Sequence, residues 1–190
     1  HKIQSCCLAF RKAISMKLKK ITEDKVKVDY LLIEGFLDIN SKYFIKEIEN
    51  GITKNDNNNF NTNVKGFMTS YVYFNNNKNF LKAIYPLFDY LDSLDNIKPY
   101  NLSSSWGLKE DFSHFTEPHD HLPSYLSGII YLNNHNQTLI FPEIEKEIKP
   151  KLNSFVVFSS FLIHQTNRNT TDKEKYAISF NLNGVLKGGK

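Results

Sequence analysis

The sequence predicts a mainly β domain, built as a two-sheet jelly roll or barrel and preceded by a smaller α+β support. After Pro99, apolar residues come in short runs separated by Asn, Pro and Asp turns, with no long helix among them. Before Pro99, apolar residues recur at helical spacing. The 190 residues, 41% hydrophobic and 14% aromatic, are enough for one core, so a single domain over 1–190 is expected.

The α+β support is expected over residues 26–98 and opens with a strand at 26–33. Asn40 and Ser41 are suited to cap a following helix, which Gly51 would end. This helix would turn one apolar face inward, formed by Phe44, Ile45 and Ile48.

An Asn-rich loop at 56–63 is too polar to order itself by burying apolar surface. From 79 to 94 apolar residues again recur at helical spacing, and Pro86 would kink this helix or start a second one. We expect it to support a sheet through Phe80, Leu81, Ile84, Leu87, Phe88, Leu91 and Leu94.

The β core is expected over residues 99–183. Five runs have the composition of short strands: 101–106, 125–132, 138–141, 154–159 and 176–182. All the candidate chemistry of the chain lies in this half, and neither a repeat nor a glycine-rich phosphate loop is present.

Composition excludes several classes of protein. The chain has 24 basic and 20 acidic residues, and the densest basic group, at 17–20, is typical of a solvated face, so nucleic acid is not indicated as a partner. No apolar run approaches the roughly 18 residues of a membrane span, so a soluble cytoplasmic protein is expected. Adjacent Cys6 and Cys7 cannot form an ordinary disulfide and are too few for a Cys-rich zinc site. They lie in residues 1–25, expected to be a peripheral extension or sequence upstream of a start at Met16.

Three histidines are the candidate metal ligands. His119 and His121 stand two residues apart, so in an extended strand both imidazoles leave the same face. His164 ends an apolar, strand-like run. Two ligands at i and i+2 with one distant ligand is the layout of non-haem Fe(II) oxygenases, so the first hypothesis is an oxidative metalloenzyme.

Glu117 is an alternative ligand, or an acceptor that orients an imidazole, although Pro118 makes a continuous strand to it doubtful. Asp120 should point away from the site. His114 and His135 lack the context of the other histidines and are expected to be ordinary surface residues.

Three sequence segments together resemble a known enzyme family. They are His119-x-His-x-x-Ser-x-x-Ser-Gly-x-x-Tyr131, Val156-Val-Phe-Ser-Ser-x-x-x-His164 and Ile178-Ser-Phe-Asn181. This pattern, covering roughly residues 100–183, resembles the uncharacterised phage and marine-bacterial branch of 2-oxoglutarate/Fe(II) oxygenases, within the wider group that contains the prolyl hydroxylases. The resemblance implies a double-stranded β-helix whose open end holds Fe(II) and the cosubstrate 2-oxoglutarate. It also implies a reaction with O2 that hydroxylates a substrate and releases succinate and CO2.

The sequence departs from the family at the metal. The family usually has Asp or Glu where this chain has His121. An all-imidazole triad leaves the site one positive charge higher, which a doubly charged 2-oxoglutarate would offset.

The second departure concerns the anchor for the distal carboxylate of 2-oxoglutarate. Related enzymes have Arg and, two residues later, Ser, where this chain has Lys175 and Ala177. A lysine offers a point charge without the bidentate fork, and Arg168 in the preceding loop is the alternative anchor. Four further residues have the alternation needed to line the cavity and hydrogen-bond the bound acid: Tyr131, Ser127, Ser179 and Asn181. Trp106 is a candidate cover for the pocket or a core residue.

Two other functions fit the same sequence. A cupin-like three-His metalloenzyme would need no 2-oxoglutarate, which agrees with the missing arginine and the missing carboxylate. A β-helix without metal would be a binding module. The substrate class stays open between a small molecule and a protein side chain, and a homodimer is an open alternative.

Overall fold

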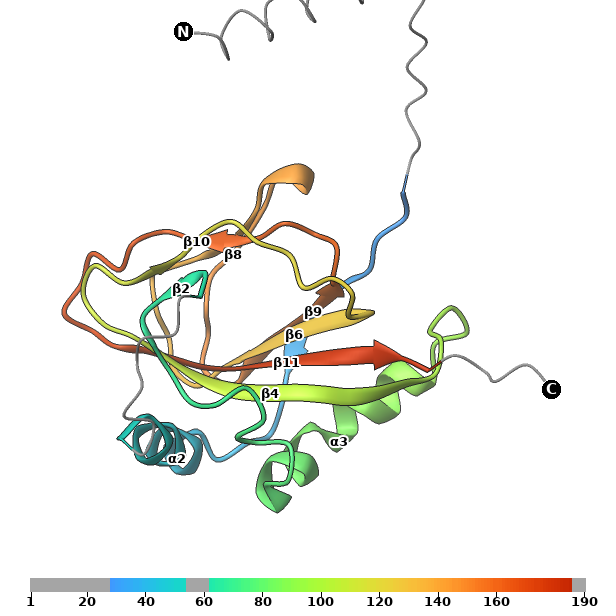
Figure 1. Cartoon of the computed structure of the whole chain (residues 1–190), viewed down its shortest axis with the longest axis horizontal. Helices are drawn as coiled ribbons and strands as arrows, with labels where there is room; N and C mark the ends of the chain where they lie inside the picture. The colour runs from blue at the N-terminus through green and yellow to red at the C-terminus, as the bar shows by residue number, and fades with distance from the viewer. Residues whose placement is uncertain (1–27, 54–61, 186–190) are drawn as a thin grey trace, which may run out of the picture.

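The computed structural model describes residues 28–53 and 62–185 (Figure 1). The expected extension at 1–25, the two cysteines, the basic group at 17–20 and most of the Asn-rich loop lie outside the described residues.

The secondary structure is mainly β, as predicted. The first half contains β1 (Leu32–Phe36), α2 (Ser41–Thr53), β2 (Val64–Lys65), β3 (Phe67–Met68) and α3 (Lys78–Asp92). The second half contains β4 (Tyr100–Glu110), β5 (Phe115–Thr116), β6 (Leu126–Tyr131), β7 (Leu139–Phe141), the short 3-10 helix η1 (Pro142–Ile144), β8 (Lys146–Ile148), β9 (Ser154–Ser159), β10 (Gln165–Thr166) and β11 (Lys175–Gly184).

Within the described residues, the strands form one large sheet and two small ones. The large sheet has the order β1-β9-β6-β11-β4-β3, and every neighbouring pair in it is antiparallel. A second sheet has the order β10-β7-β8, and β2 pairs with β5. Strands β1 and β3 come from the expected support, so the large sheet draws on both halves of the chain.

Alternation of side chains along the large sheet creates two cores. One face packs on α2 and α3, through residues such as Ile48, Ile84 and Phe180. The other face packs on the second sheet, through residues such as Phe141 and Phe158. Figure 1 shows the same layers, with both helices on one side of β4 and β11 and with β8 and β10 on the other. The second core lies between two sheets and therefore forms the inside of the β structure.

Both predicted helices are confirmed, with changes at their ends. Asn40 caps α2, since its Oδ1 accepts from the Tyr43 N–H at 3.2 Å. Gly51 does not end this helix, which continues to Thr53. A Cβ at Gly51 would lie 2.6 Å from Thr69 Cγ2, so the glycine serves close packing rather than a helix end.

The second helix supports the sheet as expected. It is capped by Asn77, whose Oδ1 accepts from the Phe80 N–H at 3.0 Å, and it runs through Pro86 as a single element. Its buried residues are Phe80, Ile84, Leu87 and Leu91. Neither helix in the described part of the chain has the length and apolarity to cross a membrane.

Candidate metal centre

The backbone brings the three histidines together from two distant segments. His119 and His164 form an antiparallel bridge, with the His119 N–H donating to the His164 carbonyl at 3.1 Å and the reverse bond at 2.9 Å. The His121 N–H donates to the Ser160 carbonyl at 2.9 Å. Two strand-like segments therefore lie side by side at this point and carry all three imidazoles.

The geometry of the three side chains is that of a metal-binding group. Their ring centroids are 4.3 Å apart for His119 and His164, 4.9 Å for His119 and His121, and 5.0 Å for His121 and His164. One nitrogen from each ring lies within 4.8 Å of the others. A divalent ion about 2.1 Å from each nitrogen would require nitrogens that approach one another in this way.

Hydrogen bonds fix the tautomer of two of the rings. His119 Nδ1 lies 2.8 Å from the Glu117 carbonyl oxygen, and His164 Nδ1 lies 3.0 Å from the Leu162 carbonyl oxygen. Because a carbonyl oxygen only accepts, each Nδ1 must carry the proton. Each Nε2 is left with a free lone pair, which is the form of histidine that binds a metal.

Burial keeps these imidazoles neutral. Desolvation is the main cause that lowers the pKa of His119, and it lowers the pKa of His121 and His164 to about 3, with repulsion from the neighbouring histidines adding to the effect. Neutral imidazoles do not require a proton to be displaced before they bind a metal at pH 7.

The carboxylate of Glu117 lies outside this group. It pairs with Lys65, with Nζ and Oε2 3.3 Å apart, and both side chains are about half exposed. Glu117 contributes its backbone carbonyl to the site instead, as the acceptor for His119. Asp120 is also outside the triad, and its Oδ1 accepts from the Leu122 N–H at 2.9 Å.

A cavity of about 320 Å³ opens at His119 and His121, and His164 is not part of its lining. Its lining is Thr62, Asn63, Val64, Met68, Tyr71, Trp106, His119, Asp120, His121, Leu122, Pro123, Ser124 and Asn181. Trp106 is only 4% exposed, and its ring centroid is 6.0 Å from that of His121. The Nε1–H of this indole is buried and has no hydrogen-bond partner among the described residues.

The four predicted cavity residues lie on the inward face of β6 and β11. Ser127 is opposite Asn181, and its Oγ lies 2.8 Å from Asn181 Oδ1 and 2.8 Å from Ser160 Oγ. Ser179 and Tyr131 are buried further along these strands. Only Asn181 of the four lines the cavity at the triad.

Lys175 has a protein carboxylate as its partner. It is 2% exposed and forms an ion pair with Glu110, which is 1% exposed and lies directly opposite on β4. The second carboxylate oxygen, Oε1, accepts from Thr116 Oγ1 and from Gln137 Nε2, each at 3.3 Å. Lys175 is not part of the lining of the triad cavity. The role of Lys175 as the anchor of 2-oxoglutarate stays a prediction. Its partner Glu110 was not predicted from the sequence.

A signal for Glu110 does exist in the sequence. Trp106, Leu108 and Glu110 alternate along one strand, so they share a face, and that face is otherwise apolar. A carboxylate in such a position needs a buried partner of opposite charge.

Arg168 lies away from the triad. Its Nη1 donates to the Ser113 carbonyl at 3.1 Å, and its guanidinium stacks 4.0 Å above the ring of Phe115. In this arrangement the guanidinium of Arg168 binds residues near the surface and does not reach the three histidines.

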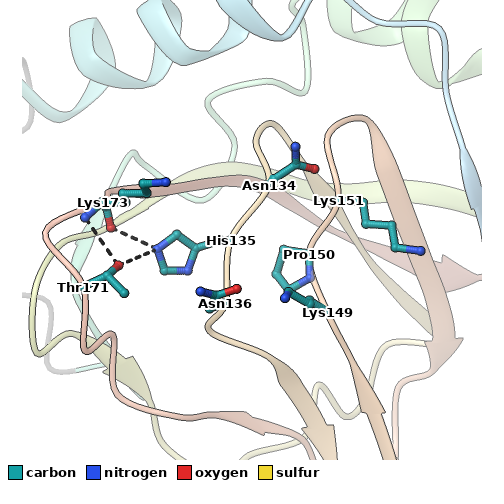
Figure 2. A pocket seen from close by; sticks show the side chains of 8 residues that line it. All are labelled: Asn134, His135, Asn136, Lys149, Pro150, Lys151, Thr171 and Lys173. Carbon is teal, nitrogen blue, oxygen red and sulfur yellow. Dashed lines mark hydrogen bonds between the residues drawn. The ribbon is translucent and has the colours of Figure 1, made fainter.

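The expectation for His135 was wrong. This residue is 5% exposed, its Nε2 lies 2.9 Å from the Lys173 carbonyl oxygen, and its Nδ1 accepts from the Gln137 N–H. It lies at a separate surface cavity of about 540 Å³, where Figure 2 shows it bonded to Lys173 and Thr171 on one side, with Lys149 and Lys151 lining the other side. His114 is also engaged in the fold, since its Nδ1 accepts from the Asp111 N–H at 2.9 Å.

Comparison with known proteins identifies the fold. No protein-family model and no curated protein matches the sequence. Among solved structures, the viral collagen prolyl hydroxylase from Paramecium bursaria Chlorella virus-1, in complex with 2-oxoglutarate, has a TM-score of 0.64 and 17% identity over 82% of this chain and 96% of its own. A prolyl-4-hydroxylase from Pseudomonas putida has a TM-score of 0.63 and 12% identity over 82% and 93%. HygX from Streptomyces hygroscopicus, with nickel and 2-oxoglutarate bound, has a TM-score of 0.54 and 12% identity over 83% of each chain. The chain therefore shares its fold with these enzymes, in agreement with the fold that the sequence resemblance implied.

The role of His121 can be tested by two substitutions. We expect His121→Asp to keep metal binding, because a carboxylate ligand suits Fe(II) at this position, and His121→Ala to weaken it by at least about tenfold. Equilibrium titration with Fe(II) under anaerobic conditions measures both. Wild-type affinity in His121→Ala would show that His121 is not a ligand.

Proposed function

We propose that this protein is an Fe(II)- and 2-oxoglutarate-dependent dioxygenase on a double-stranded β-helix, with His119, His121 and His164 as the metal ligands. The observation that carries the proposal is the convergence of three neutral imidazoles, two of them held with Nε2 free, at the opening of a buried β core. The three histidines would hold the iron, and iron with 2-oxoglutarate would supply the oxidising chemistry, with O2 as oxidant, that hydroxylates a C–H bond of the substrate and releases succinate and CO2.

The donor set fits a divalent first-row ion. Imidazole nitrogen suits iron, and three ligands grouped on one side leave coordination positions for other molecules. Three neutral ligands also leave the ion its full double charge, which favours a doubly charged cosubstrate.

The walls of the cavity indicate how a substrate would be held. Tyr71 packs edge-to-face on Trp106 with ring centroids 5.2 Å apart, and Leu122 and Pro123 also line the cavity. These residues favour a substrate that presents an apolar group. Both a small molecule and a protein side chain have this character.

The pairing of Lys175 with Glu110 favours a second candidate. A cupin-like three-His metalloenzyme that does not use 2-oxoglutarate needs no free cation in the core, and Lys175 is already neutralised. Anaerobic addition of 2-oxoglutarate to the Fe(II) protein separates the two functions. The proposed dioxygenase should develop a metal-to-ligand charge-transfer band and, in air, release succinate. Metal binding without either signal would favour the cupin-like enzyme.

Metal binding should quench the fluorescence of the protein. Trp106 is the only tryptophan of the chain and lies next to His121, so an open-shell ion at the triad would be close to the only indole. We expect anaerobic Fe(II), or Ni(II) in air, to give a saturable loss of emission that His119→Ala removes. Unchanged emission at saturating metal would contradict an ion at this triad.

A further inference from the structure

We propose that Glu110 is a specificity-determining residue of this centre: its carboxylate holds Lys175 in place of the distal carboxylate of 2-oxoglutarate and so weakens binding of the cosubstrate. The inference rests on the proposed function. It concerns a residue outside the three histidines. In this arrangement the Glu110 carboxylate competes with the cosubstrate for Lys175.

The geometry places the two carboxylates in competition. Lys175 lies on the inward face of β11, the face that also carries Asn181 in the cavity wall. Tyr131 lies opposite Ala177, two residues along β11 from Lys175. The predicted anchor Lys175 and the predicted cavity residue Tyr131 are thus both buried on neighbouring strands. Glu110 is already the carboxylate partner of Lys175 that a ligand carboxylate would have to become.

The contacts of Glu110 hold it in that position. Both of its oxygens are engaged, one by Lys175 and the other by Thr116 and Gln137. A distal carboxylate arriving at Lys175 would meet a like charge that is 1% exposed and cannot turn into solvent. Like charges brought together in a dry site repel strongly, so the cosubstrate gains little from Lys175 while Glu110 is ionised.

The charge count gives a reason for this arrangement. In a site with two histidines and one carboxylate, the ligand carboxylate and a basic anchor cancel each other. Here His121 replaces the ligand carboxylate, and Glu110 restores the missing negative charge at the anchor. Iron then balances 2-oxoglutarate, and Lys175 balances Glu110.

The first measurement uses the wild-type protein. We compare 2-oxoglutarate with 2-oxovalerate, a 2-oxo acid of the same chain length that lacks the distal carboxylate, by calorimetry on the Mn(II) form. Because Lys175 is already paired, we expect the two affinities to differ by less than about fivefold. A preference for 2-oxoglutarate above about a hundredfold would show that its distal carboxylate engages the anchor fully, and would overturn the inference.

The second measurement uses Glu110→Gln, which keeps the size of the side chain and removes its charge. We expect 2-oxoglutarate to bind about tenfold more tightly or better, and 2-oxovalerate and Mn(II) to bind as in the wild type. The gain should disappear in Glu110→Gln/Lys175→Met, which has neither charge. Glu34→Gln is the matched control, because Glu34 pairs with Lys146 at the surface, with 2.8 Å between Oε1 and Nζ, and its loss should leave all three affinities unchanged.

The outcomes separate the inference from the function on which it rests. Equal binding of 2-oxoglutarate by the wild type and Glu110→Gln overturns the inference and leaves the dioxygenase proposal standing. A gain that persists without Lys175 also overturns it. Absence of 2-oxoglutarate binding in both proteins, with Mn(II) bound, overturns the proposed function itself.

Discussion

Replacing His164 with alanine is expected to reduce metal affinity on the order of a hundredfold or more, because it removes one of three ligands whose Nε2 atom is held ready for the ion. The fold should survive. His164 packs on Phe158, with ring centroids 4.8 Å apart, so its loss should cost about 1–3 kcal/mol of unfolding free energy. Anaerobic Fe(II) titration and urea unfolding measure the two effects.

Two further variants make this result interpretable. His119→Ala should lose metal affinity to a similar degree, and His114→Ala should not, because His114 lies outside the triad. Full Fe(II) affinity in both His164→Ala and His119→Ala would show that these histidines do not bind the metal.

The second large effect is expected at Lys175, and it is an effect on stability. Lys175→Met leaves the carboxylate of Glu110 buried without a cation, which costs about 3–5 kcal/mol in buried ion pairs. The double variant Glu110→Gln/Lys175→Met should recover most of this loss, because two neutral groups then face each other. Urea unfolding measures both differences. A loss below about 1 kcal/mol in Lys175→Met would show that Glu110 finds another partner or takes up a proton.

The grouping of the three histidines could be predicted from the sequence because its signal is local. Two histidines at i and i+2 share a face of any extended segment, and the run before His164 has the composition of a buried strand. The strand at 154–159 agrees with β9 residue for residue. The other strands expected after Pro99 were found with ends displaced by a few residues, as for β4, which extends to Glu110. The strand expected at 26–33 was misplaced, because β1 is Leu32–Phe36 and shares only residues 32 and 33 with it.

The remaining features depend on partners far away in the chain. Strands β2, β3, β5 and β10 have two residues each, too few to show any period, and they exist only through pairing. The burial of His135 depends on the carbonyl of Lys173, and the role of Lys175 depends on Glu110, which lies across the sheet. Only the folded structure brings these groups into contact.

The hydrogen-bond acceptors that orient His119 and His164 are of the same kind. Each is the backbone carbonyl of the residue two positions earlier, Glu117 in one case and Leu162 in the other. Every amino acid has this backbone carbonyl, so the orientation of the two imidazole rings does not depend on which side chains are present at positions 117 and 162. Evolution is therefore free to vary both positions for the needs of the surface or of a substrate without disturbing the ligand geometry, provided that the chain keeps its path.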